Sequence, residues 1–208
     1  MQKTKLYLAG TGGFAREVLY LMEDLNLYDN LNAFIEPDNI WEEKWKDKIL
    51  MGKPVLPFSE VNNGDSVSIG IGDAIIRKKT TTQLPEGLNY ISLIHPSANV
   101  SRWTKIGNGC IITAGCIVTT QINIGDHCQL NLNTTIGHDC VIGDYFTTAP
   151  SVNISGICEI GNNVYFGTGA ATRQGVKICD DVVIGMGAMV VKNIENPGTY
   201  IGIPAKKL

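Results

Sequence analysis

The stretch that decides the fold runs from Ile106 to Asp144 and reads IGNGCIITAGCIVTTQINIGDHCQLNLNTTIGHDCVIGD. An aliphatic residue returns at every sixth position, and the same frame holds from Ile94 to Val190. Fifteen of its seventeen positions are apolar, and the two exceptions are Thr148 and Thr172. Neither an α-helix nor a simple alternating strand produces a period of six. The pattern predicts a parallel β-helix in which three hexapeptides form a coil and residues eighteen apart stack.

Glycine and cysteine occupy fixed places in this frame. Glycine follows the aliphatic residue at seven positions, as expected where the chain bends tightly at each corner: Gly107, Gly125, Gly137, Gly143, Gly161, Gly167 and Gly185. Five of the six cysteines lie four residues after the aliphatic residue: Cys110, Cys116, Cys128, Cys140 and Cys158. Because valine and alanine fill that place elsewhere, the thiols are expected to pack inward as small, free side chains.

Charge and hydropathy exclude several classes of protein. Seventeen basic and twenty acidic side chains give a net charge of −3, so the chain has no basic surplus for a nucleic-acid partner. No apolar run approaches the roughly 20 residues of a membrane helix, and MQKTKLYLAG lacks the apolar core of a signal peptide. We expect a cytoplasmic protein that binds no membrane and whose cysteines remain reduced.

A change in texture near Ile94 predicts two domains, 1–93 and 94–208, the second with a C-terminal tail. Residues 1–93 hold 10 basic and 13 acidic side chains, whereas the longer remainder holds 7 of each. In the first domain, the apolar patterns predict strands and helices that form a small Rossmann-like parallel α/β sheet. The predicted strands are 5–9, 32–35, 66–70 and 89–93. One predicted helix follows the glycine turn GTGG, and a second spans 74–83.

The glycine turn of the first domain is a candidate phosphate site. Gly10, Gly12 and Ala15 match the dinucleotide fingerprint G-x-G-x-x-G/A, although Glu36 comes late for a ribose contact. Backbone N–H groups at the start of a helix attract a phosphate, so a nucleotide-bearing ligand is expected. The alternative is a tight turn without a ligand. An NAD-dependent oxidoreductase is disfavoured because its sheet would be larger.

The three histidines, His95, His127 and His138, fall at different places in the eighteen-residue coil. They are therefore not expected to converge on zinc, and we expect no metal. His95 is expected at the domain junction, and His127 is expected at a solvated corner.

His138 is the candidate catalytic residue. It is predicted to point outward, with Asp139 beside it and Gly156 eighteen residues on, one coil along the same face. An imidazole can take a proton at neutral pH, a carboxylate can orient the ring, and a glycine N–H can stabilise an oxyanion. The alternative is an exposed histidine with an incidental aspartate.

Seven segments carry a resemblance over nearly the whole chain: GTGGFAREVLYLM, FIEPD, IGIGDAIIRKK, SLIHPSANV, GHDCVIGDY, SGICEIG and IGIPAKKL. On these segments the sequence resembles the NeuD/PglD-like hexapeptide acyltransferases. The resemblance implies a left-handed β-helix, acetyl-CoA as co-substrate, and trimers with active sites between neighbouring helices. It also implies acetylation of a bacterial sugar. The acceptor is either the 4-amino group of a nucleotide-linked 4-amino-4,6-dideoxy sugar or a hydroxyl of sialic acid.

The resemblance also implies a role for each matching residue. His138 is the general base, Asp139 polarises it, and the Gly156 N–H contacts the acetyl carbonyl. Thr168 and Met186 contact acetyl-CoA, and Thr147 stands where many members have a second histidine that contacts the coenzyme. The nucleotide sugar is assigned to Gly12, Gly13, Phe14, Glu36, Pro37 and Gly72. Phe14 and Pro37 depart from the family pattern, which bears on the choice of acceptor.

The function expected from the sequence is acetyl-CoA-dependent N-acetylation of a nucleotide-linked amino sugar. Transfer is expected to be direct, because no Ser or Cys is placed as an activated nucleophile. The alternatives are O-acetylation of a sialic or related sugar and a non-catalytic nucleotide-sugar-binding module. Four outward residues that are apolar or small favour a closed threefold assembly: Ala149, Pro150, Ile157 and Ala171.

Overall fold

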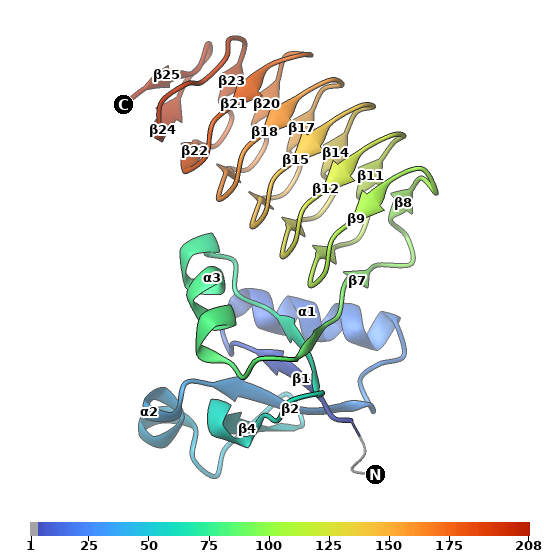
Figure 1. Cartoon of the computed structure of the whole chain (residues 1–208), viewed down its shortest axis with the longest axis vertical. Helices are drawn as coiled ribbons and strands as arrows, with labels where there is room; N and C mark the ends of the chain where they lie inside the picture. Colours follow the sequence, from blue (N-terminus) through green and yellow to red (C-terminus); the bar gives the residue numbers. More distant parts are fainter. Residues whose placement is uncertain (1–3) are drawn as a thin grey trace. The chain divides into compact units, whose positions relative to one another are not determined.

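The computed structural model describes residues 4–208 and divides into two compact units, 1–93 and 94–208 (Figure 1). The first unit is a parallel sheet with helices, and the second is a stack of short strands. Each has its own hydrophobic core. Among the described residues, no helix is both long and apolar enough to cross a membrane.

The sheet of the first unit has the strand order β3-β4-β2-β1-β5-β6. All neighbours pair in parallel except β3 and β4, which are antiparallel. Side chains of β1, such as the fully buried Tyr7 and Ala9, form its core with those of β2 and β5. The strands are β1 (Leu6–Ala9), β2 (Leu31–Glu36), β3 (Ile49–Leu50), β4 (Lys53–Pro57), β5 (Ser66–Ile69) and β6 (Asn89–Tyr90).

Two longer helices and three short ones complete the first unit: α1 (Gly13–Asp24), α2 (Asp38–Ile40), the π-helix η1 (Trp41–Trp45), the 3₁₀-helix η2 (Phe58–Glu60) and α3 (Ala74–Gln83). One side of α1 is buried and includes Val18, Leu19 and Met22, as their spacing predicts. The side chain of Asp73 caps α3 by accepting the Ile76 N–H at 2.9 Å. The sequence predicted α1 and α3 but not the helices and strands between Pro37 and Pro57.

The second unit has three faces, each a parallel sheet of strands stacked one coil apart (Figure 1). The first face contains β7 (Leu93–Ile94), β10 (Ile111–Ile112), β13 (Gln129–Leu130), β16 (Thr147–Thr148), β19 (Tyr165–Phe166), β22 (Val182–Ile184), β24 (Gly198–Ile201) and the antiparallel β25 (Lys206–Lys207). The second contains β8 (Asn99–Val100), β11 (Ile117–Val118), β14 (Thr135–Ile136), β17 (Asn153–Ile154), β20 (Ala171–Thr172) and β23 (Met189–Val190). The third contains β9 (Lys105–Ile106), β12 (Asn123–Ile124), β15 (Val141–Ile142), β18 (Glu159–Ile160) and β21 (Lys177–Ile178).

The register confirms the eighteen-residue coil. Thr135 pairs with Asn153 and Ile136 with Ile154, and the parallel pairs from β8 to β23 keep the same offset. The register changes at the C-terminal end, where Val183 of β22 pairs with Thr199 of β24, sixteen residues on. The aliphatic residues of the frame line the interior together with five cysteines that are at most 1% exposed. Their burial confirms the inward packing that was expected of these five. All six cysteines are free thiols.

The corner glycines have a different cause from the one expected. The left-handed residue of a corner is the third after the aliphatic residue, for example Asp139 and Ile157, both at φ 60°. Gly137, directly after the aliphatic Ile136, has no such φ. It lies so close to the next coil that a Cβ would sit 2.6 Å from the backbone nitrogen of Gly156. Close approach of the coils, not a tight bend, therefore requires glycine at this place.

Candidate functional site

His138 lies at the corner between β14 and β15, and Gly156 lies at the same corner one coil on. We call this place the His138 corner. A Cβ on Gly156 would lie 2.8 Å from Nε2 and 2.9 Å from Cε1 of His138. The imidazole thus rests directly on the bare glycine, as the eighteen-residue spacing predicts. A side chain at Gly156 would displace the ring.

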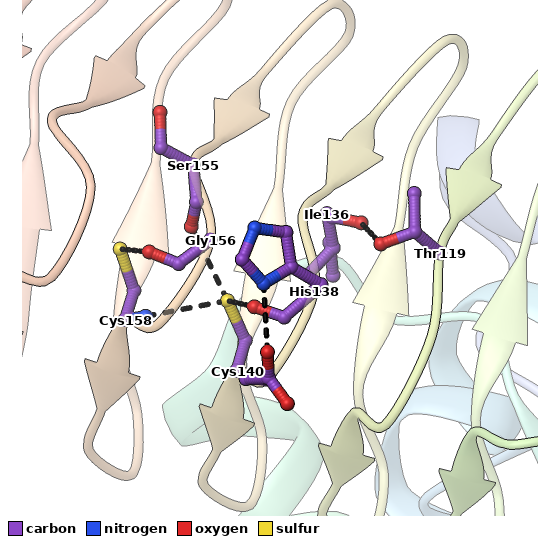
Figure 2. A network of polar contacts seen from close by, with 8 residues as sticks. Thr119, Ile136, His138, Cys140, Ser155, Gly156 and Cys158 are labelled. Atoms are coloured by element: carbon purple, nitrogen blue, oxygen red, sulfur yellow. Dashed lines mark hydrogen bonds and ion pairs between the residues drawn. The ribbon is translucent and has the colours of Figure 1, made fainter.

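Asp139 orients the imidazole. Nδ1 of His138 and Oδ2 of Asp139 are 2.7 Å apart, and both side chains are 50% exposed (Figure 2). With the ring proton donated from Nδ1 to this carboxylate, Nε2 keeps a lone pair and can accept a proton. Nε2 makes no hydrogen bond to another residue within 4–208. The backbone of His138 is also held, because its carbonyl accepts the Ile157 N–H at 2.7 Å.

Apart from Gly156, the residues expected to contact acetyl-CoA lie elsewhere on the β-helix. Thr168 and Met186 occupy successive coils at the corner between the first and second faces, and the Thr168 carbonyl accepts the Gly187 N–H at 2.8 Å. Met186 is 82% exposed. Thr147 belongs to neither corner: it begins β16, is buried, and donates its hydroxyl to the Tyr145 carbonyl at 3.3 Å. Within one chain, His138 therefore lies at one corner, and Thr168 and Met186 lie at another.

The residues expected to bind the nucleotide sugar gather at one edge of the first unit. They follow the carboxyl ends of three adjacent parallel strands, where open α/β sheets bind their ligands: Gly12, Gly13 and Phe14 after β1, Glu36 and Pro37 at the end of β2, and Gly72 after β5. A Cβ on Gly12 or Gly72 would meet no atom within 4 Å. Glu36 is fixed by the Thr11 hydroxyl, which donates to Oε1 at 2.6 Å.

Arg77 supports this edge and was not among the residues predicted. It is completely buried on α3, and its Nη1 donates to the carbonyls of Ile71 (2.7 Å) and Gly72 (3.1 Å). A buried guanidinium requires such partners, so Arg77 fixes the loop that carries Gly72. The apolar pattern of α3 gave no signal for this burial, because Ile75 and Ile76 beside Arg77 are exposed.

His127 is not the solvated corner residue that was expected. It is only 7% exposed, and its ring stacks on that of Tyr145 with centroids 5.2 Å apart and planes at 14°. Tyr145 follows His127 by eighteen residues and therefore covers it from the next coil. In the part of the chain that the structure describes, no group of three or more His, Cys, Asp or Glu could hold a metal ion.

Comparison with known proteins places this architecture among acetyltransferases. No protein-family model matches the chain. The acetyltransferase domain of PglB from Neisseria gonorrhoeae is similar, with a TM-score of 0.88 and 28% identity over 99% of this chain and 100% of that domain. It has also been solved with acetyl coenzyme A. WeeI from Acinetobacter baumannii AYE gives the same four values.

A third similar structure is the perosamine N-acetyltransferase from Caulobacter crescentus, solved as a variant with CoA and GDP-perosamine. Its TM-score is 0.84, with 26% identity over 97% of this chain and 95% of that one. These similarities extend across both units, so they concern the combination of sheet and β-helix as well as the repeat. They confirm the resemblance stated from the sequence: the chain is an acyltransferase built like the hexapeptide-repeat sugar N-acetyltransferases.

Proposed function

We propose that the protein transfers the acetyl group of acetyl-CoA to the amino group of a nucleotide-linked amino sugar of the 4-amino-4,6-dideoxy type. The observation that carries this proposal is the imidazole of His138, held by Asp139 and resting on the bare backbone of Gly156. The perosamine enzyme, solved with CoA and a GDP-linked sugar, supports the choice of substrates.

The His138 corner supplies a base and a hydrogen-bond donor. Nε2 of His138 takes a proton from the acceptor amine as its nitrogen bonds to the acetyl carbon. The Gly156 N–H donates to the carbonyl oxygen as negative charge develops there. The carbon–sulfur bond then breaks, and the coenzyme sulfur takes up a proton. No acyl-enzyme forms, because Cys140 and Cys158 are buried on the inner side of the coil.

The two corners become one site in the homotrimer that we propose. The second face lies between the His138 corner and the corner of Thr168 and Met186. If this face is turned toward a threefold axis, the His138 corner of one subunit meets the other corner of its neighbour. Within its strands, the outward residues of this face are uncharged, which suits such packing: Asn99, Ile117, Thr135, Asn153, Ala171 and Met189.

The first unit is assigned to the nucleotide sugar. Gly12 and Gly13 present the N-terminus of α1, whose N–H groups favour a phosphate, and Glu36 is placed to meet a sugar hydroxyl. The free cysteines agree with a cytoplasmic location.

A turnover screen tests the reaction. Acetyl-CoA is incubated with UDP-, GDP- and dTDP-linked 4-amino sugars and with free and activated sialic acid, while thiol release and product mass are followed. Amide formation on a nucleotide sugar is the expected result. Ester formation on sialic acid alone would reassign the enzyme to O-acetylation. Nucleotide binding without thiol release from any acceptor would indicate a binding module.

Mixing subunits tests the shared site. His138 and Gly156 lie against each other within one subunit. A cleft therefore receives both residues from the same subunit, and variants of these two residues are not expected to complement each other. His138→Ala subunits mixed with Thr168→Trp subunits are expected to regain part of the activity, because some clefts then combine an intact His138 with an intact Thr168. If the mixed trimer regains no activity, the two corners do not form one shared site. A fully active monomer would also exclude the shared cleft.

A further inference from the structure

The inward cysteines share a contact that packing alone does not explain. Each thiol donates to the backbone carbonyl fifteen residues further along the chain, in the corner of the next coil. The five pairs are Cys110 and Gly125 (3.2 Å), Cys116 and Asn131 (3.2 Å), Cys128 and Gly143 (3.1 Å), Cys140 and Ser155 (3.2 Å), and Cys158 and Arg173 (3.5 Å). These carbonyls face the interior, where an unpaired polar group is costly. Cysteine therefore fits this place as a hydrophobe that also donates a hydrogen bond.

For Cys140 the partner is the peptide that joins Ser155 to Gly156. Figure 2 shows its sulfur linked to the backbones of Ser155, His138 and Cys158. A trans peptide holds its C=O and N–H on opposite sides. Because the thiol binds the Ser155 carbonyl from the interior, the N–H of Gly156 is directed outward, where the imidazole of His138 lies. This N–H finds no acceptor among residues 4–208.

The surrounding contacts fix the thiol and the peptide. The Ser155 N–H donates to Oγ1 of Thr172 at 2.9 Å, and the Ser155 hydroxyl donates to the Thr172 carbonyl at 2.7 Å. Cys140 in turn accepts the Cys158 N–H at 3.4 Å. A side-chain hydrogen bond with Cys158, in which Cys140 keeps its proton, and burial together raise the pKa of Cys140. Cys140 is therefore a neutral S–H at physiological pH and is able to donate.

We propose that Cys140 is a positioning residue for the reaction: its S–H holds the Ser155–Gly156 peptide so that the Gly156 N–H points at the acetyl carbonyl oxygen. The proposal rests on the acetyl transfer assigned above to the His138 corner. The N–H interacts most strongly when the carbonyl oxygen carries charge, so misplacing it raises the barrier more than it weakens binding. Cys140 acts through Gly156 and touches no substrate.

Three variants separate positioning from packing. Cys140→Val keeps the approximate volume and removes the donor, Cys140→Ser keeps a donor, and Cys110→Val removes a donor at the same 3.2 Å from a different corner. We expect Cys140→Val to lower kcat about 10-fold with KM for acetyl-CoA within about 2-fold, a part of the roughly 10²-fold or more that loss of a whole oxyanion donor costs. Cys140→Ser should recover most of kcat, and Cys110→Val should keep it despite a similar fall in Tm. Equal kcat in the two valine variants would overturn the proposal.

A measurement without turnover separates this proposal from the proposed function. Glycine-selective ¹⁵N labelling reports the amides of the glycines, and the resonance of Gly156 is identified by its loss in Gly156→Ala. This resonance should shift in Cys140→Val and stay in place in Cys110→Val. An unmoved resonance in Cys140→Val overturns the positioning even if the enzyme is active. A shift in a protein that acetylates no acceptor would retain the positioning and reject the proposed function.

Discussion

Two corners of the same β-helix use equivalent backbone N–H groups in opposite ways. At the corner between the third and first faces, an aspartate or asparagine in each coil accepts the N–H of the equivalent residue one coil earlier, at 2.7–2.8 Å. We call this series the ladder; it consists of Asn108, Asp126, Asp144, Asn162 and Asp180. The equivalent place at the His138 corner holds His138 and Gly156, and the N–H of Gly156 has no acceptor among residues 4–208. One corner uses its donors for stability, whereas in the proposed reaction the other uses one donor to bind the acetyl carbonyl oxygen.

Replacing one histidine from each corner should give the largest contrast. His138→Ala is expected to lower kcat about 10²-fold or more, since general-base catalysis contributes roughly 10² to 10⁴, while Tm changes little because the side chain is half exposed. His127→Ala is the control: it removes the stack on Tyr145 and should cost about 1–3 kcal/mol of unfolding free energy with kcat retained. Near-native turnover of His138→Ala with saturating acceptor would show that the base lies elsewhere.

Installing a ladder residue at the His138 corner should add a structural contact and lower activity. Gly156→Asp supplies an acceptor for the His138 N–H, as Asp144 does for Asp126. Its Cβ enters the space of the imidazole. We expect kcat to fall about 10²-fold, as for loss of the base or the oxyanion donor, with an unfolding free energy within about 1 kcal/mol of the native value, because the new contact offsets the displaced ring. Urea unfolding and steady-state kinetics on the same preparation decide this; retained kcat would show that the ring need not lie on a bare glycine.

Removing one member of the ladder should have the smallest effect, and only on stability. Asp144→Ala leaves the Asp126 N–H without its acceptor, a loss comparable to removing a helix N-cap, about 0.5–2 kcal/mol. Asp144→Asn keeps an acceptor oxygen and should recover most of that loss. The kcat of both variants should equal that of the native enzyme. A lower kcat in Asp144→Ala would mean that the two corners are coupled.

The sequence predicts the β-helix well because its register is a strict count. An in-register parallel coil forces His138 and Gly156 together once the period of eighteen is known. The same count places Tyr145 over His127, but the expectation for His127 considered only its place at a corner. The link from Cys140 to Ser155 was missed because a fifteen-residue offset crosses a corner, whose carbonyl orientation a pattern of side-chain types does not reveal.

The first unit was predictable where periodicity is strong and not where it is absent. The helix at 74–83 was predicted with the bounds that the structure shows. The segment from Pro37 to Pro57 contains a π-helix and two strands, and its prolines and clustered charges give neither a helical nor an alternating pattern. Arg77 was missed because its burial depends on carbonyls of the preceding loop, which no apolar pattern records.

The eighteen-residue register also governs how the second unit folds and opens. Each coil pairs only with the coils before and after it, so order spreads along the stack from neighbour to neighbour, as in repeat proteins. Such a stack unravels from its ends. His138 and Gly156 occupy middle coils, and the strands that flank them should show slow amide hydrogen exchange. Met186 lies near the end of the stack, which β24 and β25 cover. The His138 corner is therefore expected to be among the last parts of the β-helix to lose its structure, and the coil of Met186, near the end, is expected to loosen earlier.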